Sequence, residues 1–359
     1  MAKIDNQNMN TQKYKYSKTI RSWLIIGLVM LIGQVILGGI TRLTGSGLSI
    51  TRWDIVSGVI PPINTQQWND AFDLYKQTPQ YHKLNSDFLL NDFKFIFFWE
   101  YAHRLWVRVL GFVFLIPFLI FLFRKKIDWY LISRLGLVIF FTALTASAGW
   151  IMVQSGLVDR PWVDAYKLSL HFILAVLSIS AMVKTIADVN NYKNQGENSV
   201  GTSILSLLIS ITFLQLIVAG LMSGMKAGLY FPTWPDMNRT FIPDVLLKSG
   251  NWTWYNFTNY DSYVFAPAII QFTHRLLAYL LLVLTIYIFY KYKSEVDQLT
   301  KKWLNVSFLL VFLQITLGVL TLLNIETGIP LFYGVAHQLV GILFFISLLF
   351  LYFSLRKKA

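Results

Sequence analysis

Two short stretches combine a histidine and an arginine with a polar side chain three residues earlier. They are FFWEYAHR at 97–104 and QFTHR at 271–275. Residues three apart share one face of a helix, so Glu100 in the first stretch and Gln271 in the second lie beside their histidines. A carboxylate can take a proton, attack a cation or stabilise developing positive charge, whereas an amide cannot titrate. The contrast between Glu100 and Gln271 predicts that the reaction takes place at the first stretch and that the second stretch has a passive redox role.

Each of these stretches is followed, at a similar distance, by another histidine in an apolar run. His103 precedes His171 by 68 residues, and His274 precedes His337 by 63. A single buried histidine is usually a core residue bonded to a neighbouring helix, but four at matched positions are hard to explain that way. Helix bundles hold cofactors between facing side chains. With no cysteine in the chain and only two histidines per group, the pattern favours haem iron over zinc or non-haem iron.

Several arginines are candidate partners for the carboxylates of a haem. Arg104 and Arg275 directly follow their histidines, and a planar guanidinium is well suited to pairing with a propionate. Snorkelling to lipid headgroups is the alternative for both. Arg42 and Arg52, in the segment TRLTGSGLSITRW at 41–53, are further candidates.

The composition indicates a membrane protein. Of the 359 residues, 55% are hydrophobic and 14% are charged, which is too apolar for an ordinary soluble enzyme. The net charge of +13 does not indicate a nucleic-acid partner, because Lys and Arg cluster at the ends of apolar runs. The absence of cysteine excludes disulfides and thiolate sites.

Eight apolar runs are long enough to cross a membrane, which takes about 20 residues. Basic residues in the N-terminal tail, in the links at 124–134 and 291–302 and at the C-terminus fall on one side, so both termini are expected to be cytoplasmic. The first run lacks a cleavage site and the tail lacks transit-peptide character, which favours a bacterial cytoplasmic membrane. The eight runs lie at about 22–41, 94–123, 133–153, 168–185, 203–223, 267–290, 303–323 and 332–354.

An internal repeat predicts the architecture. Residues 32–39 (IGQVILGG) resemble residues 213–220 (FLQLIVAG), and the histidine-bearing runs recur in the same order. A unit of four spans restores the original orientation, so the halves are parallel repeats, unlike inverted-repeat transporters. The fold class is therefore an all-α polytopic membrane protein with eight transmembrane helices in two four-helix bundles.

The predicted division of the chain follows from the repeat. A cytoplasmic tail (1–21) precedes an N-terminal bundle at 22–190, and a cytoplasmic linker at 191–202 leads to a C-terminal bundle at 203–359. The outer loops at 42–93 and 224–266 are rich in aromatic residues and proline, and are expected to fold as caps. His82, in the first loop, is expected to be solvated, and Gly45 to shape a turn.

The chain resembles the haem A synthase family, in the long type found in mitochondria and many Gram-negative bacteria. The resemblance runs through nearly the whole chain in order. Its motifs are GGITRLTGSGLS (38–49), Pro61-Pro62, FKFIFFWEYAHR (93–104), QSGL (154–157), AYKLSLHFILA (165–175), QFTHRLLAY (271–279) and LGVLTLL with VAHQ (317–338).

The resemblance implies a function and a set of sites. Members oxidise the C8 methyl of haem O to a formyl group, giving haem A for cytochrome oxidase. His103 and His171 match the ligands of the substrate haem, His274 and His337 match those of a haem b, and Glu100 matches the essential acid. The chain departs from the family at Lys167, where many long-type members have arginine, and in lacking the cysteine pair of short-type members.

Two other function classes remain open at this stage. A b-type electron-transfer cytochrome with two bis-histidine haems accounts for the histidines but not for the contrast between Glu100 and Gln271. A transporter predicts charges at mid-membrane, whereas those here lie near the outer ends. The membrane haem O synthase is the expected supplier of substrate. The sequence leaves open the electron partner and the source of the oxygen atom. It also leaves open the oligomeric state, and a homo-oligomer is possible.

Overall fold

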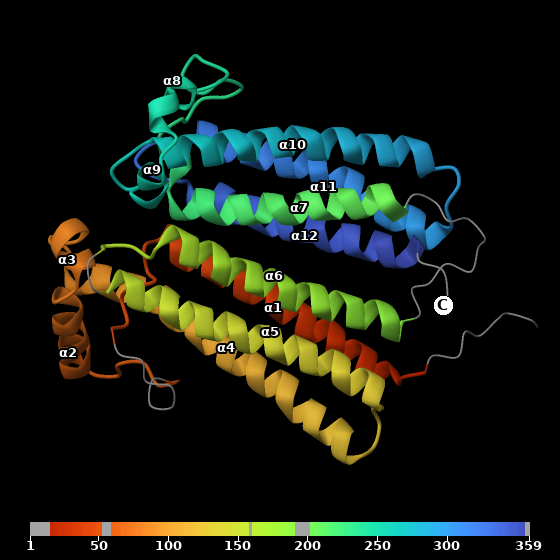
Figure 1. Ribbon diagram of the computed structural model, residues 1–359. Coiled ribbons are helices and arrows are strands. Elements are labelled where there is room, and N and C mark those ends of the chain that lie inside the picture. The colour runs from red at the N-terminus through yellow and green to blue at the C-terminus, as the bar shows by residue number, and fades with distance from the viewer. Residues whose placement is uncertain (1–14, 52–58, 158–159, 191–201, 356–359) are drawn as a thin grey trace, which may run out of the picture.

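The computed structural model describes residues 15–51, 59–157, 160–190 and 202–355. Apart from one isolated bridge pair, the regular structure in these residues is helical, with eight helices long and apolar enough to cross a membrane (Figure 1). All eight predicted spans are confirmed, each extended by a few residues. They are α1 (Lys18–Leu43), α4 (Leu90–Phe123), α5 (Trp129–Gly156), α6 (Ala165–Val189), α7 (Thr202–Gly224), α10 (Phe265–Tyr292), α11 (Gln298–Leu323) and α12 (Leu331–Leu355).

Local sequence fixes where several of these helices begin. Ser17, Asp128, Asp164 and Asp297 cap α1, α5, α6 and α11, each accepting a backbone N–H of the first turn with its side chain. Such caps satisfy donors that the first turn of a helix leaves unpaired. The ends of α1 and α7 also correspond, because Gly45 (φ 68°) follows α1 and Lys226 (φ 51°) follows α7 in the left-handed conformation.

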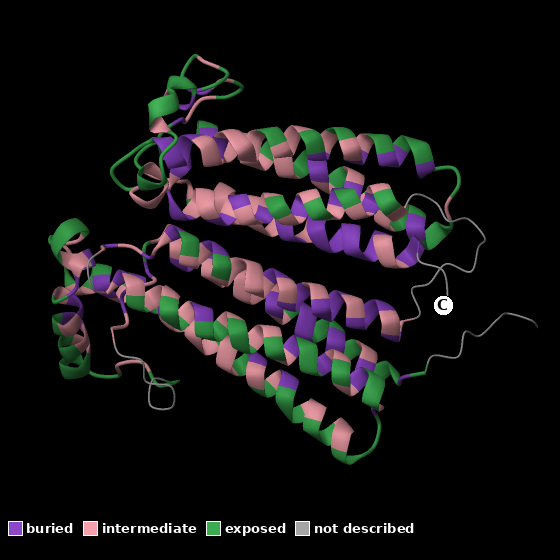
Figure 2. Cartoon of the chain, in the orientation of Figure 1, coloured by how far each residue is buried: buried purple, intermediate pink, exposed green. Residues whose placement is uncertain are grey.

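The long helices lie in two groups of four that pack against each other (Figure 1). In the first group α1 contacts α4 and α6, and α5 contacts α6; in the second α7 contacts α10 and α12, and α11 contacts α10 and α12. The groups meet where α6 contacts α7 and α12, and where α1 contacts α12. Helices α12 and α6 are accordingly the most buried, and α4 and α5 the most exposed (Figure 2).

Small residues allow the close approach between the groups. A Cβ on Gly224 of α7 would lie 2.6 Å from Cα of Ala165 in α6, and one on Gly220 would lie 2.9 Å from Cα of Ser169. Helices in lipid associate through such contacts, because the hydrophobic effect gives them no driving force there. The helix that carries His171 is thus held tightly against α7.

Both long connecting segments fold at the same end of the molecule (Figure 1). The first contains α2 (Thr65–Lys76) and α3 (Pro79–Leu84), and the second contains η2 (Ala227–Leu229), α8 (Asp244–Leu247), η3 (Ser249–Asn251) and α9 (Trp254–Thr258). Phe72 and Tyr75 of α2 pack on Phe93 at the start of α4. His82 is exposed, as expected.

Candidate functional site

The second histidine of each half has its ring held by a backbone carbonyl of the preceding helix. Nδ1 of His171 lies 2.8 Å from the Thr145 carbonyl oxygen, and Nδ1 of His337 lies 3.0 Å from that of Gln314. Because a carbonyl can only accept, Nδ1 carries the proton in both rings. This leaves the lone pair on Nε2, which is the arrangement found in metal-binding histidines.

A glycine one turn beyond each of these carbonyls makes room for the imidazole. A Cβ on Gly149 would lie 2.8 Å from Cε1 of His171, and a Cβ on Gly318 would lie 2.8 Å from Cε1 of His337. Both distances are shorter than any ordinary carbon–carbon contact. These two glycines were not predicted from the sequence. An alignment of the third helix of one half with the third helix of the other would have shown that they occupy matching positions.

The first histidine of each half is held from the first helix of that half. Nε2 of Gln34 in α1 donates to the carbonyl of His103 at 3.2 Å, and Nε2 of Gln215 in α7 donates to that of His274 at 3.0 Å. The two glutamines occupy the same place in the IGQVILGG and FLQLIVAG repeats. The internal repeat is therefore also a repeat of contacts.

In the C-terminal half the two histidines face each other. The ring centroids of His274 and His337 are 6.2 Å apart, with 65° between their planes. Metal–imidazole bonds are about 2 Å long, and a coordinating nitrogen lies about 1 Å from its ring centre for C–N bonds of about 1.3 Å. Two imidazoles on opposite sides of one metal ion therefore have centroids roughly 6 Å apart.

Buried polar atoms near this pair are also left without partners. Among the described residues, Nδ1 of His274 and Oε1 of Gln314 are buried and make no hydrogen bond, although the Gln314 amide nitrogen lies 3.4 Å from Nε2 of His337. No described group of three or more His, Asp or Glu could hold a bare metal ion. The spacing, the donor set and the orphaned atoms fit a haem iron held by His274 and His337.

Glu100 is buried and is surrounded by donors. Its Oε2 accepts from the backbone N–H (2.8 Å) and hydroxyl (2.7 Å) of Ser49 and from the N–H of Ile50 (2.8 Å). Its Oε1 pairs with Arg104 at 2.5 Å, and Arg104 also donates to the carbonyl of Ile50. A carboxylate only accepts hydrogen bonds, so it matches this set of donors. Glu100 and Arg104 together bind the segment that follows α1.

Gln271 and Arg275 bind the segment that follows α7 in the complementary way. The amide of Gln271 donates to the carbonyl of Phe231 at 2.9 Å, and Arg275 donates to the carbonyls of Asp236 (2.6 Å) and Thr233 (2.8 Å). The first segment presents N–H groups and so matches an acceptor; the second presents carbonyls and so matches a donor. The Glu–Gln difference therefore has a structural reason as well as the chemical one predicted from sequence.

The structure gives the candidate propionate partners contacts within the protein. Arg104 and Arg275 bind the segments just described, and Arg42 donates to the carbonyls of Ser223 (2.7 Å) and Gly224 (3.3 Å) at the end of α7. A guanidinium suits that position because the last carbonyls of a helix are unpaired and carry partial negative charge. A propionate contact for these arginines stays a prediction, and Arg52 lies outside the described residues.

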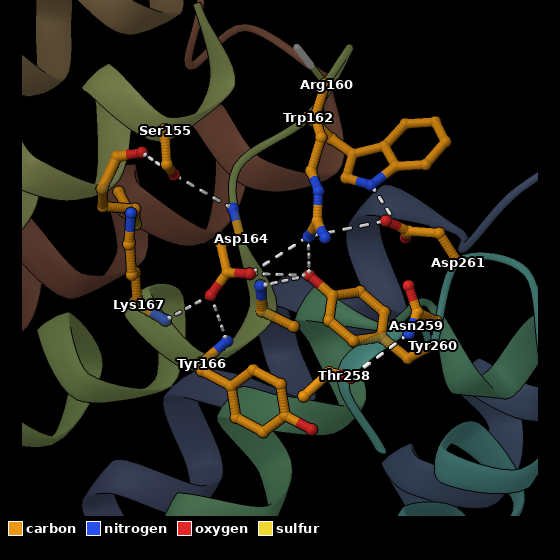
Figure 3. Close-up of polar contacts among 12 residues, drawn as sticks. Ser155, Arg160, Trp162, Asp164, Tyr166, Lys167, Thr258, Asn259, Tyr260 and Asp261 are labelled. Carbon is orange, nitrogen blue, oxygen red and sulfur yellow. Dashed lines mark hydrogen bonds and ion pairs between the residues drawn. The ribbon is translucent and has the colours of Figure 1, made fainter. Parts of the chain in front are cut away.

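A polar cluster joins the two halves at the end of the molecule where the long connecting segments lie (Figure 3). The hydroxyl of Tyr260, from the second long loop, donates to Asp164 (3.1 Å) and accepts from Arg160 (2.8 Å). Asp261 beside it accepts from Trp162 at 3.0 Å. Burial raises the pKa of Tyr260, so its hydroxyl stays protonated and can donate. Since Asp164 caps α6, this cluster fixes the start of the helix that carries His171.

Eight membrane-length helices with two repeat-related pairs of interior histidines define a class: a multi-pass helical membrane protein with paired imidazoles in its core. The chain belongs to the family of cytochrome oxidase assembly proteins, whose model matches residues 21–349. This confirms the family resemblance drawn from the sequence.

The relatives agree over nearly the full length. The chain is 37% identical to a protein named heme A synthase from Nitrosospira multiformis, over 97% of this chain and 96% of the relative. It is 36% identical to proteins of the same name from Flavobacterium psychrophilum (90% and 94% covered) and Pelagibacter ubique (91% and 94% covered).

Proposed function

We propose that the protein is a haem A synthase, which oxidises the C8 methyl of haem O to a formyl group and so supplies haem A to cytochrome oxidase. The names of the relatives support this function. The observation in the molecule that carries it is the facing pair His274–His337, repeated in sequence by His103 and His171. A passive b-type cytochrome would use the same histidines and would leave Glu100 only its contacts with Ser49, Ile50 and Arg104, but the names of the relatives support an enzyme.

The two histidine pairs take different roles in this proposal. His274 and His337 hold a haem b, which supplies one-electron redox chemistry when bound. His103 and His171 hold the substrate, haem O. Their rings lie against glycines of the neighbouring helices, with a Cβ on Gly38 at 3.3 Å from Nε2 of His103. Such small residues let each ring lie close to the neighbouring helix.

Glu100 is the working acid in the proposal. In each oxidation step the C8 carbon loses two electrons and one proton to an external electron acceptor, and so carries positive charge. A carboxylate fixed nearby stabilises that charge or forms an ester with the carbon, and water then adds its oxygen to the carbon and releases the carboxylate. Ser49, Ile50 and Arg104 fix the carboxylate through four contacts, so it needs no reorganisation when charge develops. Its burial also keeps bulk water away from the carboxylate.

The proposal extends to location and partners. The protein lies in a bacterial cytoplasmic membrane with both termini cytoplasmic and with the loops 42–93 and 224–266 outside. The bundles at 22–190 and 203–359 form the substrate half and the haem b half. Haem O reaches the first from the membrane haem O synthase.

The test is expression in a host that makes haem O but no haem A, followed by mass analysis of extracted haems. Wild type is expected to yield haem A, and Glu100→Gln to accumulate haem O while keeping its bound haem b. His82→Ala, which changes an exposed histidine, is the control and should match wild type. Absence of both haem A and its hydroxymethyl precursor from the wild-type extract would refute the function. Normal haem A from Glu100→Gln would refute the role of the acid.

A further inference from the structure

Three of the four histidines differ in the environment of the second ring nitrogen. A metal-bound imidazole almost always donates its other N–H to a carbonyl, carboxylate or water, which fixes the tautomer and strengthens the ligand. His171 and His337 already make this bond, to the carbonyls of Thr145 and Gln314. Nδ1 of His274 is buried and makes no hydrogen bond among the described residues.

A candidate acceptor is carried by a residue that already contacts the backbone of His274. Gln215 is tethered to His274 by the 3.0 Å bond from its amide nitrogen to the histidine carbonyl. The oxygen of the same amide is buried and receives no hydrogen bond from any described residue. An unsatisfied donor and an unsatisfied acceptor thus lie on two residues already in contact, and a buried polar group left unpaired is costly.

The N-terminal half repeats the glutamine part of the arrangement. Gln34 is tethered to His103 by its amide nitrogen at 3.2 Å, and its oxygen is again buried and unpaired within the described chain. Gln34 and Gln215 stand at the same place in the internal repeat. Gln314 also has an unpaired side-chain oxygen, but the backbone carbonyl of Gln314 already accepts the N–H of His337. Chance does not readily leave the same atom orphaned beside the first histidine of both halves.

We propose that Gln34 and Gln215 are positioning residues for the iron ligands: the side-chain oxygen of each accepts the N–H that His103 or His274 presents when its other ring nitrogen holds iron. The proposal rests on the proposed function, because it assumes haem at both pairs. The glutamine nitrogen bonds the backbone carbonyl of the histidine, and the glutamine oxygen fixes the orientation of the imidazole ring. The amide therefore fixes the tautomer and the electron density of the ligand without touching the haem.

The test measures the bound haem b and not product formation. Purified wild type, Gln215→Met and Gln215→Glu are titrated spectroelectrochemically, and their affinity for haem is measured. Both variants lose the amide nitrogen that bonds the His274 carbonyl, so the difference between them reports the side-chain oxygen. Methionine also removes the acceptor, so in Gln215→Met the potential should rise and the affinity should fall 10- to 100-fold. Glutamate strengthens the acceptor, so the potential should fall. Each tenfold change in the relative binding of the two oxidation states moves the potential by about 59 mV.

The duplication supplies a matched control. Gln34→Met makes the same change in the other half and should leave the potential of the C-terminal haem as in wild type. Unchanged potentials in both Gln215 variants, or an equal shift in Gln34→Met, would overturn the inference. Wild-type protein that binds haem b but makes no haem A would instead overturn the proposed function and leave this inference standing.

Discussion

The contact between Gly318 and His337 gives the sharpest prediction. In Gly318→Ala the new Cβ would lie 2.8 Å from Cε1 and 3.3 Å from Nδ1 of the imidazole. Non-bonded carbons come no closer than about 3.5 Å without strain, so the ring must move by roughly 0.7 Å or more. The bond from Nδ1 to the Gln314 carbonyl, now 3.0 Å, cannot survive a shift of that size in the same direction.

The magnitude follows from these two effects. Overpacking a well-packed site costs about 1–3 kcal/mol, and loss of one hydrogen bond costs about 0.5–1.5 kcal/mol. A net loss of about 2–4 kcal/mol corresponds to a roughly 30- to 700-fold weaker affinity for haem b, at about 1.4 kcal/mol per tenfold. We expect Gly318→Ala to be purified largely free of haem b.

The assay is a titration of the haem-free protein with haem, followed by its absorbance. Gly136→Ala in α5 is the control, because nothing lies within 4 Å of a Cβ at that position. Alanine is the better helix former by about 1 kcal/mol, so this control should bind haem like wild type. If Gly318→Ala also binds haem with wild-type affinity, His337 is not the ligand or its ring is not held as described.

Three further predictions concern stability. Tyr260→Phe removes the hydroxyl that donates to Asp164, and should lower the melting temperature without altering haem b spectra; an unchanged melt would contradict the role of the polar cluster. Gly39→Ala places a Cβ 2.4 Å from Oε1 of Gln338, so the amide must swing away and give up its bond to the Val35 carbonyl, which should cost about 0.5–1.5 kcal/mol in denaturant titrations. Burial of Asp128 alone would raise its pKa, but hydrogen bonds from the Lys15 ammonium and neighbouring groups lower it to about 2. A depressed pKa stabilises the fold above the unfolded value, so the advantage of wild type over Asp128→Asn should be present at pH 5–8 and shrink as pH falls below about 4; a constant difference would refute it.

The sequence by itself determined the helices and the repeat, and it singled out four histidines as candidate ligands. Apolar runs of about 20 residues can only be helices in lipid, because every backbone group must be satisfied within its own segment. The recurrence of His-Arg pairs at matched positions then marked His103 and His274 without any contact being known. This information is local or periodic, so a single chain displays it.

Only the tertiary structure showed how each histidine is held. Ser49 and Glu100 are 51 residues apart, and Gln34 and His103 are 69 apart, so no local pattern announces that they touch. The arginines show the same limit, because residue type suggested a propionate partner whereas packing brought backbone carbonyls to each guanidinium. Helix formation depends on neighbours in the chain, but the second ring nitrogen of a histidine is satisfied by whichever carbonyl or amide the packing of another helix brings to it.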